Sequence, residues 1–212
     1  MVNLPKCQEL FTLESDFLQN IFDNIFYPWE LIPKLKVIID AMLTTGIPGY
    51  TRLTDKILVA DGAYISDRAY IEGTAIIGKN ATLRHGAYLR GSVILCEECV
   101  VGNSSEIKNS ILMTGAQAPH FNYVGDSILG NKAHLGAGAI CSNLRSDRKS
   151  VTIKSDSVSI DTGLKKLGAI LGDDVEVGCG AVLCPGSIIG KNSVVYPLTM
   201  VRGVHEKNSL IK

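Results

Sequence analysis

The sequence lacks an excess of charge of either sign, because lysine plus arginine and aspartate plus glutamate both number 21 in its 212 residues. A protein that grips nucleic acid needs a basic surface, so this balance argues against such a partner. No uncharged apolar run approaches the roughly 18 residues that a membrane-spanning helix needs. The opening MVNLPKCQELF also lacks the basic and then apolar pattern of a secretory signal. We therefore expect a cytoplasmic protein whose partners are neither nucleic acid nor membrane.

Cysteine pairs at metal-binding spacing are also missing. Cys96 and Cys99 form a single C-x-x-C pair, and no second pair stands at zinc spacing from it. Five of the six cysteines fall inside the repeat described next, where small side chains are needed. We expect buried, reduced thiols and no metal site.

The sequence does contain a period of six. Aliphatic residues recur every six positions from residue 59 to 107 and again from 171 to 201, and a column of small residues accompanies the first stretch from Ala63 to Ser105. Neither the 3.6-residue period of a helix nor the two-residue period of a strand produces this. Six residues fit a short strand plus a tight turn, and three such units make an 18-residue coil. The period predicts a mainly β protein, a single-stranded parallel β-helix.

Residues 1–46 lack the repeat and are predicted to form a helical cap. Apolar spacing predicts one helix from Glu14 to Phe26 and a second from Pro28 to about Met42, in which Pro33 either causes a kink or delays the true start. We expect these helices to cover the open end of the β-helix or to contact another subunit. Residues 47–212 are predicted to be the β-helix domain.

The aliphatic column is interrupted after Ile107. The next positions in phase are Met113 and Pro119, and a clear aliphatic phase resumes only at Leu129, a slip of four residues. A break in a repeat predicts a loop made for a function, and this segment carries His120 and Tyr123.

A second interruption spans about residues 144–166. Polar and apolar residues alternate there on both sides of Ser155-Asp156, which predicts a two-stranded arm that leaves the β-helix. The alternative is an unstructured insertion.

Five motifs in residues 57–204 resemble one family. They are Leu89-Arg90-Gly91, Glu106-Ile107-Lys108, Ala118-Pro119-His120-Phe121-Asn122-Tyr123-Val124-Gly125-Asp126, Leu135-Gly136-Ala137-Gly138 and Cys141-Ser142-Asn143. Their order and spacing resemble the acetyltransferase domain of the bifunctional glucosamine-1-phosphate acetyltransferase/N-acetylglucosamine-1-phosphate uridylyltransferases. They resemble still more the C-terminal domain of archaeal-type sugar-1-phosphate nucleotidyltransferases. The resemblance implies a left-handed coil, a homotrimer with sites between subunits, and acetyl-CoA as cosubstrate.

The resemblance also implies roles for individual residues in the synthesis of UDP-N-acetylglucosamine precursors. The catalytic residues would be His120, as general base, and Asn143, beside the acetyl and amine groups. The implied sugar-phosphate ligands are Arg90, Lys108, Tyr123 and His134. The implied coenzyme contacts are Gly136, Ala137 and Cys179.

The residue types suit this chemistry independently of the resemblance. An amine attacks a thioester only when it is neutral, and a histidine that titrates near 6.5 can accept its proton at neutral pH. A phosphate suits the planar guanidinium of Arg90 together with the point charge of Lys108. An oxyanion needs fixed N–H donors, which a tight glycine-rich turn can supply.

Three departures from the family pattern leave alternatives open. His134 stands where the family has asparagine, so the acceptor sugar is open. The C-terminal tail that contacts the coenzyme is expected to be short, and residues 1–46 hold no glycine-rich nucleotide-binding loop. The alternatives are a non-catalytic trimeric scaffold or regulatory partner of a separate nucleotidyltransferase, and acetylation of a different acceptor.

Overall fold

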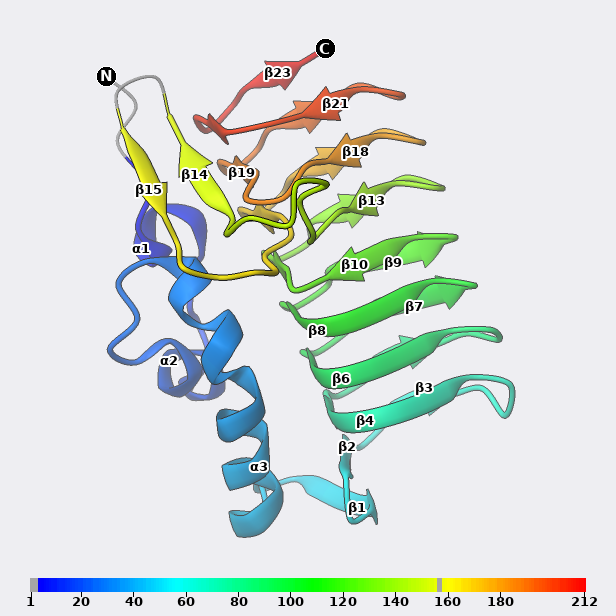
Figure 1. The fold of residues 1–212 in the computed structure, drawn as a ribbon. Coiled ribbons are helices and arrows are strands. Elements are labelled where there is room, and N and C mark those ends of the chain that lie inside the picture. The colour runs from blue at the N-terminus through cyan, green and yellow to red at the C-terminus, as the bar shows by residue number, and fades with distance from the viewer. Residues whose placement is uncertain (1–3, 156–157) are drawn as a thin grey trace.

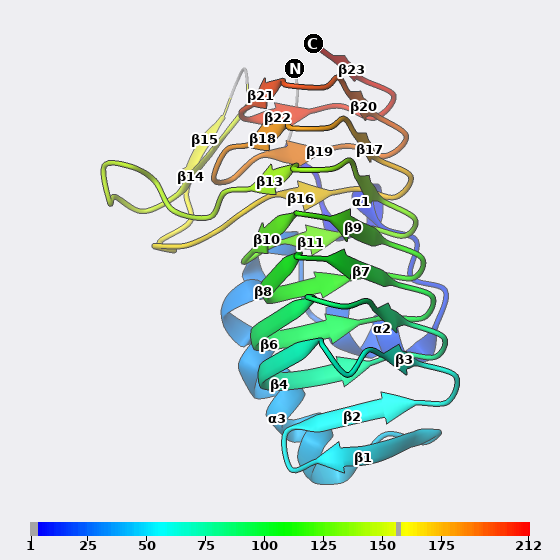
Figure 2. The ribbon, with the colours of Figure 1, turned by 90° about the vertical axis from the view of Figure 1, so that its right-hand side faces the viewer.

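The computed structural model describes residues 4–155 and 158–212 and shows a left-handed parallel β-helix with three flat faces (Figures 1 and 2). The predicted fold class is therefore confirmed. The chain climbs from β1 and β2 at one end to β23 at the other, and the helices lie at its side. No described helix is long and apolar enough to cross a membrane.

We number the three faces in the order in which the chain passes through them in one coil. Face I consists of the first parts of β4 (Tyr70–Ile77), β6 (Tyr88–Leu95) and β8 (Glu106–Leu112), followed by β10 (Tyr123–Gly125), β13 (Ile140–Cys141), β18 (Val182–Leu183) and β21 (Met200–Val201). Face II consists of β2 (Ile57–Ala60), the second parts of β4, β6 and β8, and then β11 (Ile128–Leu129), β16 (Ile170–Leu171), β19 (Ile188–Ile189) and β22 (Val204–His205).

Face III is the separate eight-stranded sheet. Its strands are β3 (Tyr64–Ile65), β5 (Thr82–Leu83), β7 (Val100–Asn103), β9 (Gln117–His120), β12 (His134–Leu135), β17 (Glu176–Val177), β20 (Val194–Val195) and β23 (Leu210–Ile211). The single antiparallel addition to the coils is β1 (Tyr50–Thr54), which pairs with β2 at the first coil.

The segment predicted to be a loop is a regular part of the β-helix, so that prediction is wrong. On face I, Ile107 pairs with Val124 and Val124 pairs with Cys141, and all three side chains are fully buried. Ala118 fills the corresponding inward position on face III. The column therefore continues without a gap, and the phase slips because these coils are 17 residues long rather than 18.

The missing residue lies at the corner between faces I and II. Arg90 pairs with Lys108 and Val93 pairs with Ser110, so two residues of one coil face Asn109 alone in the next. Asp126 occupies this shortened corner one coil later, and both Asn109 and Asp126 have positive φ, at 48° and 47°. The arm leaves the coils at the same corner. We call this column of turns, from Gly91 through Asn109 and Asp126 to the base of the arm, the Asp126 corner.

The N-terminal helices are α1 (Cys7–Leu10), α2 (Asp16–Phe22) and α3 (Leu35–Thr45), with short 3-10 turns at Pro28–Glu30 and Ile32–Lys34. The Ser15 hydroxyl caps α2 by accepting a hydrogen bond from Leu18 N, and Gly46 ends α3 with a φ of 76°. The predicted first helix is shorter than expected. The second starts in regular form only after Pro33, one of the two outcomes foreseen.

These helices cover face II and not the end of the β-helix. α3 contacts β4, β6 and β8 and runs beside them in both ribbon views. Outward-pointing isoleucines on this face are fully buried, whereas Tyr64 on face III and Tyr70 on face I are about 60% exposed. The buried isoleucines are Ile76, Ile94, Ile111, Ile128, Ile170 and Ile188. Helices and coils therefore share one hydrophobic core.

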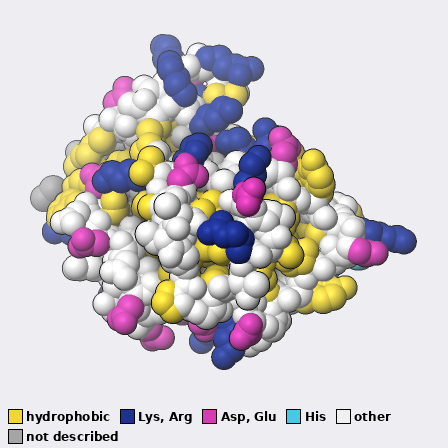
Figure 3. Space-filling model, turned by 90° about the horizontal axis from the view of Figure 1, so that it is seen from below, with side chains coloured by type: hydrophobic (Ala, Val, Ile, Leu, Met, Phe, Trp, Pro, Cys, Tyr) yellow, Lys and Arg dark blue, Asp and Glu magenta, His cyan; other side chains and the backbone are white. Residues whose placement is uncertain are grey.

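The end of the β-helix at the first coil stays open. Inward residues there, including Val59, Ile65 and Ile71, are only partly buried, although their equivalents higher up are fully buried. Apolar side chains are visible at this end when the molecule is seen from below (Figure 3).

The arm is the predicted two-stranded hairpin. It comprises β14 (Thr152–Lys154) and β15 (Ser159–Asp161), which pair antiparallel; Asp156, near the predicted turn, lies outside the described residues. Val151 and Ile153 at its base are fully buried and pack against the coil at Gly186. All six cysteines are free, and Cys96, Cys99 and Cys141 of the repeat are buried as predicted. Cys179, which is exposed, and Cys184, which is half-buried, depart from that prediction because their side chains lie outside the packed interior.

Candidate active site

The outer surface of face I carries alternating charges on neighbouring strands, with Arg90 on β6 and both Glu106 and Lys108 on β8. Arg90 on β6 lies beside Lys108 on β8 in the strand register, and Glu72 on β4 lies on the other side of Arg90. Arg90 Nη1 donates to Glu106 Oε1 at 3.2 Å, and both side chains are partly exposed. The ionic partner of Arg90 therefore comes from the strand that also carries Lys108.

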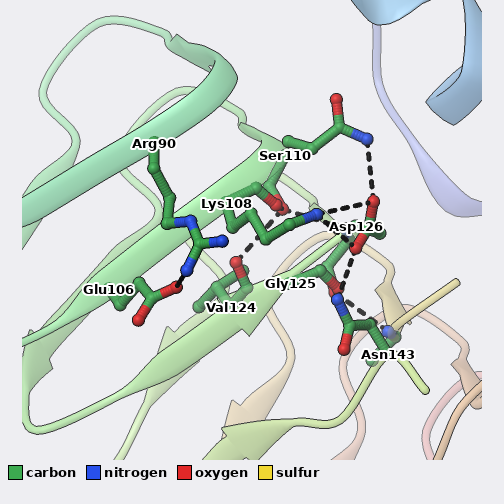
Figure 4. A network of polar contacts seen from close by, with 11 residues as sticks. Arg90, Glu106, Lys108, Ser110, Val124, Gly125, Asp126 and Asn143 are labelled. Carbon is green, nitrogen blue, oxygen red and sulfur yellow. Dashed lines mark hydrogen bonds and ion pairs between the residues drawn. The ribbon is translucent and has the colours of Figure 1, made fainter. Parts of the chain in front are cut away.

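Lys108 pairs with a buried carboxylate at the Asp126 corner. Its ammonium donates to Asp126 Oδ2 at 3.0 Å and to Oδ1 at 3.3 Å, and the exposed fractions of the two side chains are 16% and 6%. Asn109 Nδ2 donates to Oδ1 at 2.8 Å, and Asn143 Nδ2 donates to Oδ2 (Figure 4). Each carboxylate oxygen thus accepts two hydrogen bonds, which offsets the cost of burying the charge.

Tyr123 and Asn143 meet above Gly125. A β-carbon built on Gly125 would lie 2.6 Å from the Tyr123 hydroxyl and 2.6 Å from Asn143 Nδ2, so the two polar groups lie close together and leave no room for a side chain there. Burial raises the pKa of Tyr123, and Glu106 and Asp126 raise it further. The phenol therefore keeps its proton at neutral pH and can donate a hydrogen bond.

His120 lies at the corner between faces III and I. Its backbone N–H donates to Asn122 Oδ1 at 3.0 Å, its side chain is exposed, and no side chain in the described part of the chain hydrogen-bonds to the imidazole. Tyr123, three residues later, begins the face I strand of the same coil. The imidazole is therefore at the border of the face that carries Arg90 and Lys108.

The predicted coenzyme contacts stack above His120. The N–H of Gly138 donates to the carbonyl of His120 at 3.0 Å, and the N–H of Gly180 donates to the carbonyl of Ala137 at 2.9 Å. His120, Ala137 and Cys179 thus occupy equivalent positions in three successive coils, and each is exposed. We call this column the His120 edge. Within the described residues, the N–H of Ala137 donates to no protein group, so it is available to a ligand.

His134 is set apart from the other predicted sugar-phosphate ligands. It lies on face III, where it pairs with Gln117 and Glu176 in the strand register, and its Nδ1 is 3.0 Å from Glu176 Oε2. Gly136, two residues later, begins the turn that carries Ala137. A shallow hollow on face III joins His134 to Gly136 and Cys179.

The structure thus brings most of the predicted residues to two neighbouring features. Arg90, Lys108 and Asn143 gather on face I and at the Asp126 corner (Figure 4), with the Tyr123 hydroxyl close to Asn143. His120, Ala137 and Cys179 form the His120 edge, and Gly136 precedes Ala137 in its turn. Sequence analysis missed the carboxylates as partners of the two cations. Asp126 entered only as the last residue of a family motif, and the shortened coil that contains it was interpreted as a loop. In the described ranges, no cluster of three or more histidine, cysteine or carboxylate side chains could hold a metal ion.

Comparison with known proteins places this geometry in a family. The family described as the GMPPB C-terminal domain matches residues 71–183, which is more than half of the chain. The chain belongs to this family. All of the residues just described, from Arg90 to Cys179, lie inside the matched range.

Curated relatives add the names of longer proteins. The chain is 34% identical over 182 residues to a bifunctional sugar-1-phosphate nucleotidylyltransferase/acetyltransferase of Sulfurisphaera tokodaii, which covers 84% of this chain and 45% of the relative. It is 32% identical over 211 residues to the bifunctional protein GlmU of Methanococcus vannielii, with coverage of 98% and 51%. The chain therefore spans about half the length of these relatives. The chain is also 29% identical over 189 residues to a putative uncharacterized acetyltransferase, YaiX of Escherichia coli. That match covers 79% of this chain and 81% of YaiX.

Proposed function

We propose that this domain transfers the acetyl group of acetyl-CoA to the amine of an amino-sugar 1-phosphate, with glucosamine 1-phosphate as the first acceptor to test. The observation that carries the proposal is the His120 edge: an exposed imidazole stacked below the free N–H of Ala137, at the border of the face with Arg90 and Lys108. The relatives' names, which include acetyltransferase and GlmU, support the same reaction.

The chemistry follows from the order of groups around this edge. With acetyl-CoA along the column of Ala137 and Cys179, the thioester carbon would lie next to His120. His120 removes a proton from the acceptor's ammonium or from the attacking amine, and the N–H of Ala137 stabilises the oxyanion of the tetrahedral intermediate. Collapse of that intermediate expels the coenzyme A thiolate, which takes up a proton to leave as the thiol.

Arg90 and Lys108 would bind the sugar phosphate while they keep their carboxylate partners. A guanidinium has five N–H donors and an ammonium has three, so each cation has donors left after its contact with Glu106 or Asp126. Because the four charges cancel, this site would recognise phosphate by directed hydrogen bonds more than by net charge.

We also propose that the domain acts as a trimer of identical subunits. Large apolar side chains are exposed around the His120 edge: Phe121 is 59% exposed and Leu198 is 85% exposed, and Met200 on face I is 60% exposed. A second copy of the chain that buried these three side chains would also cover the solvent-exposed side of the proposed site. Sedimentation at micromolar concentration tests this, and a monomer that retains full activity would contradict it.

The activity test is a coupled assay of thiol release with several amino-sugar 1-phosphates. We expect His120→Ala to lose activity by about 100-fold or more, as is typical for loss of a general base. The matched control is His85→Ala, because His85 is another exposed histidine in an earlier coil. Loss of activity in both variants, or in neither, would refute the assigned role. If no acceptor reacts and acetyl-CoA does not raise the melting temperature, the non-catalytic scaffold becomes the better account.

A further inference from the structure

Among the residues that the structure describes, Asp126 is the one buried carboxylate that hydrogen-bonds to two of the proposed site residues. It contacts Lys108 and Asn143, which come from the coils on either side of it, and only 4% of the whole residue is exposed. Asp126 can therefore influence a bound ligand only through these two neighbours.

The contact with Asn143 decides which end of that amide faces the ligand. An ionised carboxylate only accepts hydrogen bonds, so the atom of Asn143 that faces Asp126 must be the amino group. The carbonyl oxygen of Asn143 then points away from Asp126, as Figure 4 shows. Asn143 is buried, with 8% of the residue exposed, and its amino group lies beside Asp126 and close to the Tyr123 hydroxyl.

The contact with Lys108 fixes the ammonium in a similar way. Both oxygens of Asp126 receive a hydrogen bond from it, and Asn109 occupies the remaining site on Oδ1. The carboxylate is itself held in place because the N–H of Asp126 donates to the carbonyl of Lys108 at 2.8 Å and the N–H of Gly168 donates to the carbonyl of Asp126 at 2.8 Å. Lys108, Asp126 and Asn143 therefore form one rigid unit across three coils.

We propose that Asp126 is a positioning residue for the transfer proposed above. It holds Asn143 so that the carbonyl oxygen, and not the amino group, is offered to an N–H of the acceptor amine, and it holds Lys108 toward the acceptor's phosphate. This inference rests on the proposed function, because it assigns the groups that Asn143 and Lys108 meet.

The chain offers a matched control for the test. Asp173 is another carboxylate with 4% exposure, and it accepts from Lys191 Nζ at 2.9 Å, from Asn131 Nδ2 at 3.0 Å and from the N–H groups of Asn131 and Thr12. Like Asp126, it stands 18 positions from its lysine. It ties the N-terminal segment to the coils and lies outside the proposed site.

Asp126→Asn and Asp173→Asn remove the same charge from the same kind of network. We expect both to lower the melting temperature, but only Asp126→Asn to lower kcat, on the order of 100-fold, because a displaced orienting group costs that much in reaction geometry. Asp173→Asn should stay within about twofold of the unchanged protein, since distant sites act independently. If the two variants have equal kcat and KM, Asp126 serves stability alone and the inference is wrong.

A second readout does not depend on turnover. Without ligand, the side-chain NH₂ resonances of Asn143 should be protected from solvent exchange, and Asp126→Asn should abolish this protection while Asp173→Asn leaves it intact. If the unchanged protein transfers no acetyl group, the proposed function fails, and this measurement still decides whether Asp126 holds Asn143. Should Asp126→Asn not fold, Asn109→Gly removes a single donor from the same carboxylate and accepts the positive φ at this position, and it should reduce kcat in the same direction. An unchanged kcat in this variant would count against the inference.

Discussion

Replacing Gly125 with alanine would separate damage to the site from damage to the fold. The new methyl group would meet the Tyr123 hydroxyl at 2.6 Å, Tyr123 Cε1 at 2.7 Å and Asn143 Nδ2 at 2.6 Å. The backbone of Gly125 does not have a positive φ, so alanine adds no strain of its own there. The crowded atoms belong to the ends of side chains, and the Tyr123 ring can rotate toward solvent because it is only half-buried.

The expected cost in stability is therefore at the low end of the range for overpacking, about 1 kcal/mol. In a chain of this size that would lower the melting temperature by roughly 2–4 °C. The expected cost in activity is much larger, because the methyl group displaces Tyr123 and Asn143 together. A fall in kcat/KM of about 100-fold would match the loss of geometry at two contacts.

Gly102→Ala gives the opposite pattern and serves as the comparison. A methyl group there would lie 1.6 Å from the backbone oxygen of Pro119 in the next coil, and backbone that is held in a sheet cannot rotate away. We expect this variant to unfold or to lose several times more stability than Gly125→Ala. Melting curves and steady-state kinetics of both variants test the reasoning. Normal kcat/KM in Gly125→Ala, or a milder stability loss in Gly102→Ala, would refute it.

Three further predictions concern the core and the thiols. Ile94 is fully buried beneath the helices, so Ile94→Ala should lower the free energy of unfolding by about 2–5 kcal/mol and Ile94→Val by about 0.5–1.5 kcal/mol. Denaturant titration measures both. Losses as small as those at exposed positions would mean that the helices do not cover face II. Cys179 is exposed and should react with a thiol reagent in the native protein, whereas the buried cysteines should react only after unfolding; mass spectrometry of labelled peptides distinguishes these results. Burial raises the pKa of Cys7, Cys96 and Cys141 to about 12. Because the unfolded chain loses these protons from about pH 9 and the folded one does not, stability should fall as the pH rises above 9, by up to about 1.4 kcal/mol per thiol per pH unit; a stability that stays flat from pH 8 to pH 10 would contradict this.

The sequence alone was sufficient for the β-helix because each coil repeats the same local solution. An aliphatic residue every sixth position defines an inward column whatever the distant contacts are, so the prediction needed no tertiary information. The arm was equally local, because alternation in residues 151–160 marks two short strands.

The position of the helices could have been read from a signal that was overlooked. On face II the inward residue is preceded by a second aliphatic residue, as in Ile76-Ile77, Ile94-Leu95 and Ile188-Ile189. Two adjacent aliphatic residues on a strand point to opposite sides of the sheet, so both sides must be covered. This doubling appears on face II in coil after coil and identifies it as the face that needs a cover.

His120 was singled out by a family motif and by the phase slip, and the structure does not support the second of these reasons. The phase slip was interpreted as a loop, yet the coil at His120 is regular and the slip arises at Asn109 and Asp126. A shift in period records only that residues are missing between two points. It does not say at which corner they are missing, because that depends on which strands pair across coils. For the same reason the partners of Lys108 were not predictable.

The position of all these irregularities at one corner has a consequence for engineering. The shortened turns and the 142–169 insertion all interrupt the column at the Asp126 corner, while the ladders on the three faces continue past them. This corner therefore tolerates changes in chain length, whereas the stack of equal turns at the His120 edge shows none within its described coils. Under the proposed function, new loops inserted where the arm leaves this corner would lie beside the proposed acceptor site and away from His120 and the proposed coenzyme column. Acceptor preference could then be varied separately from acyl transfer.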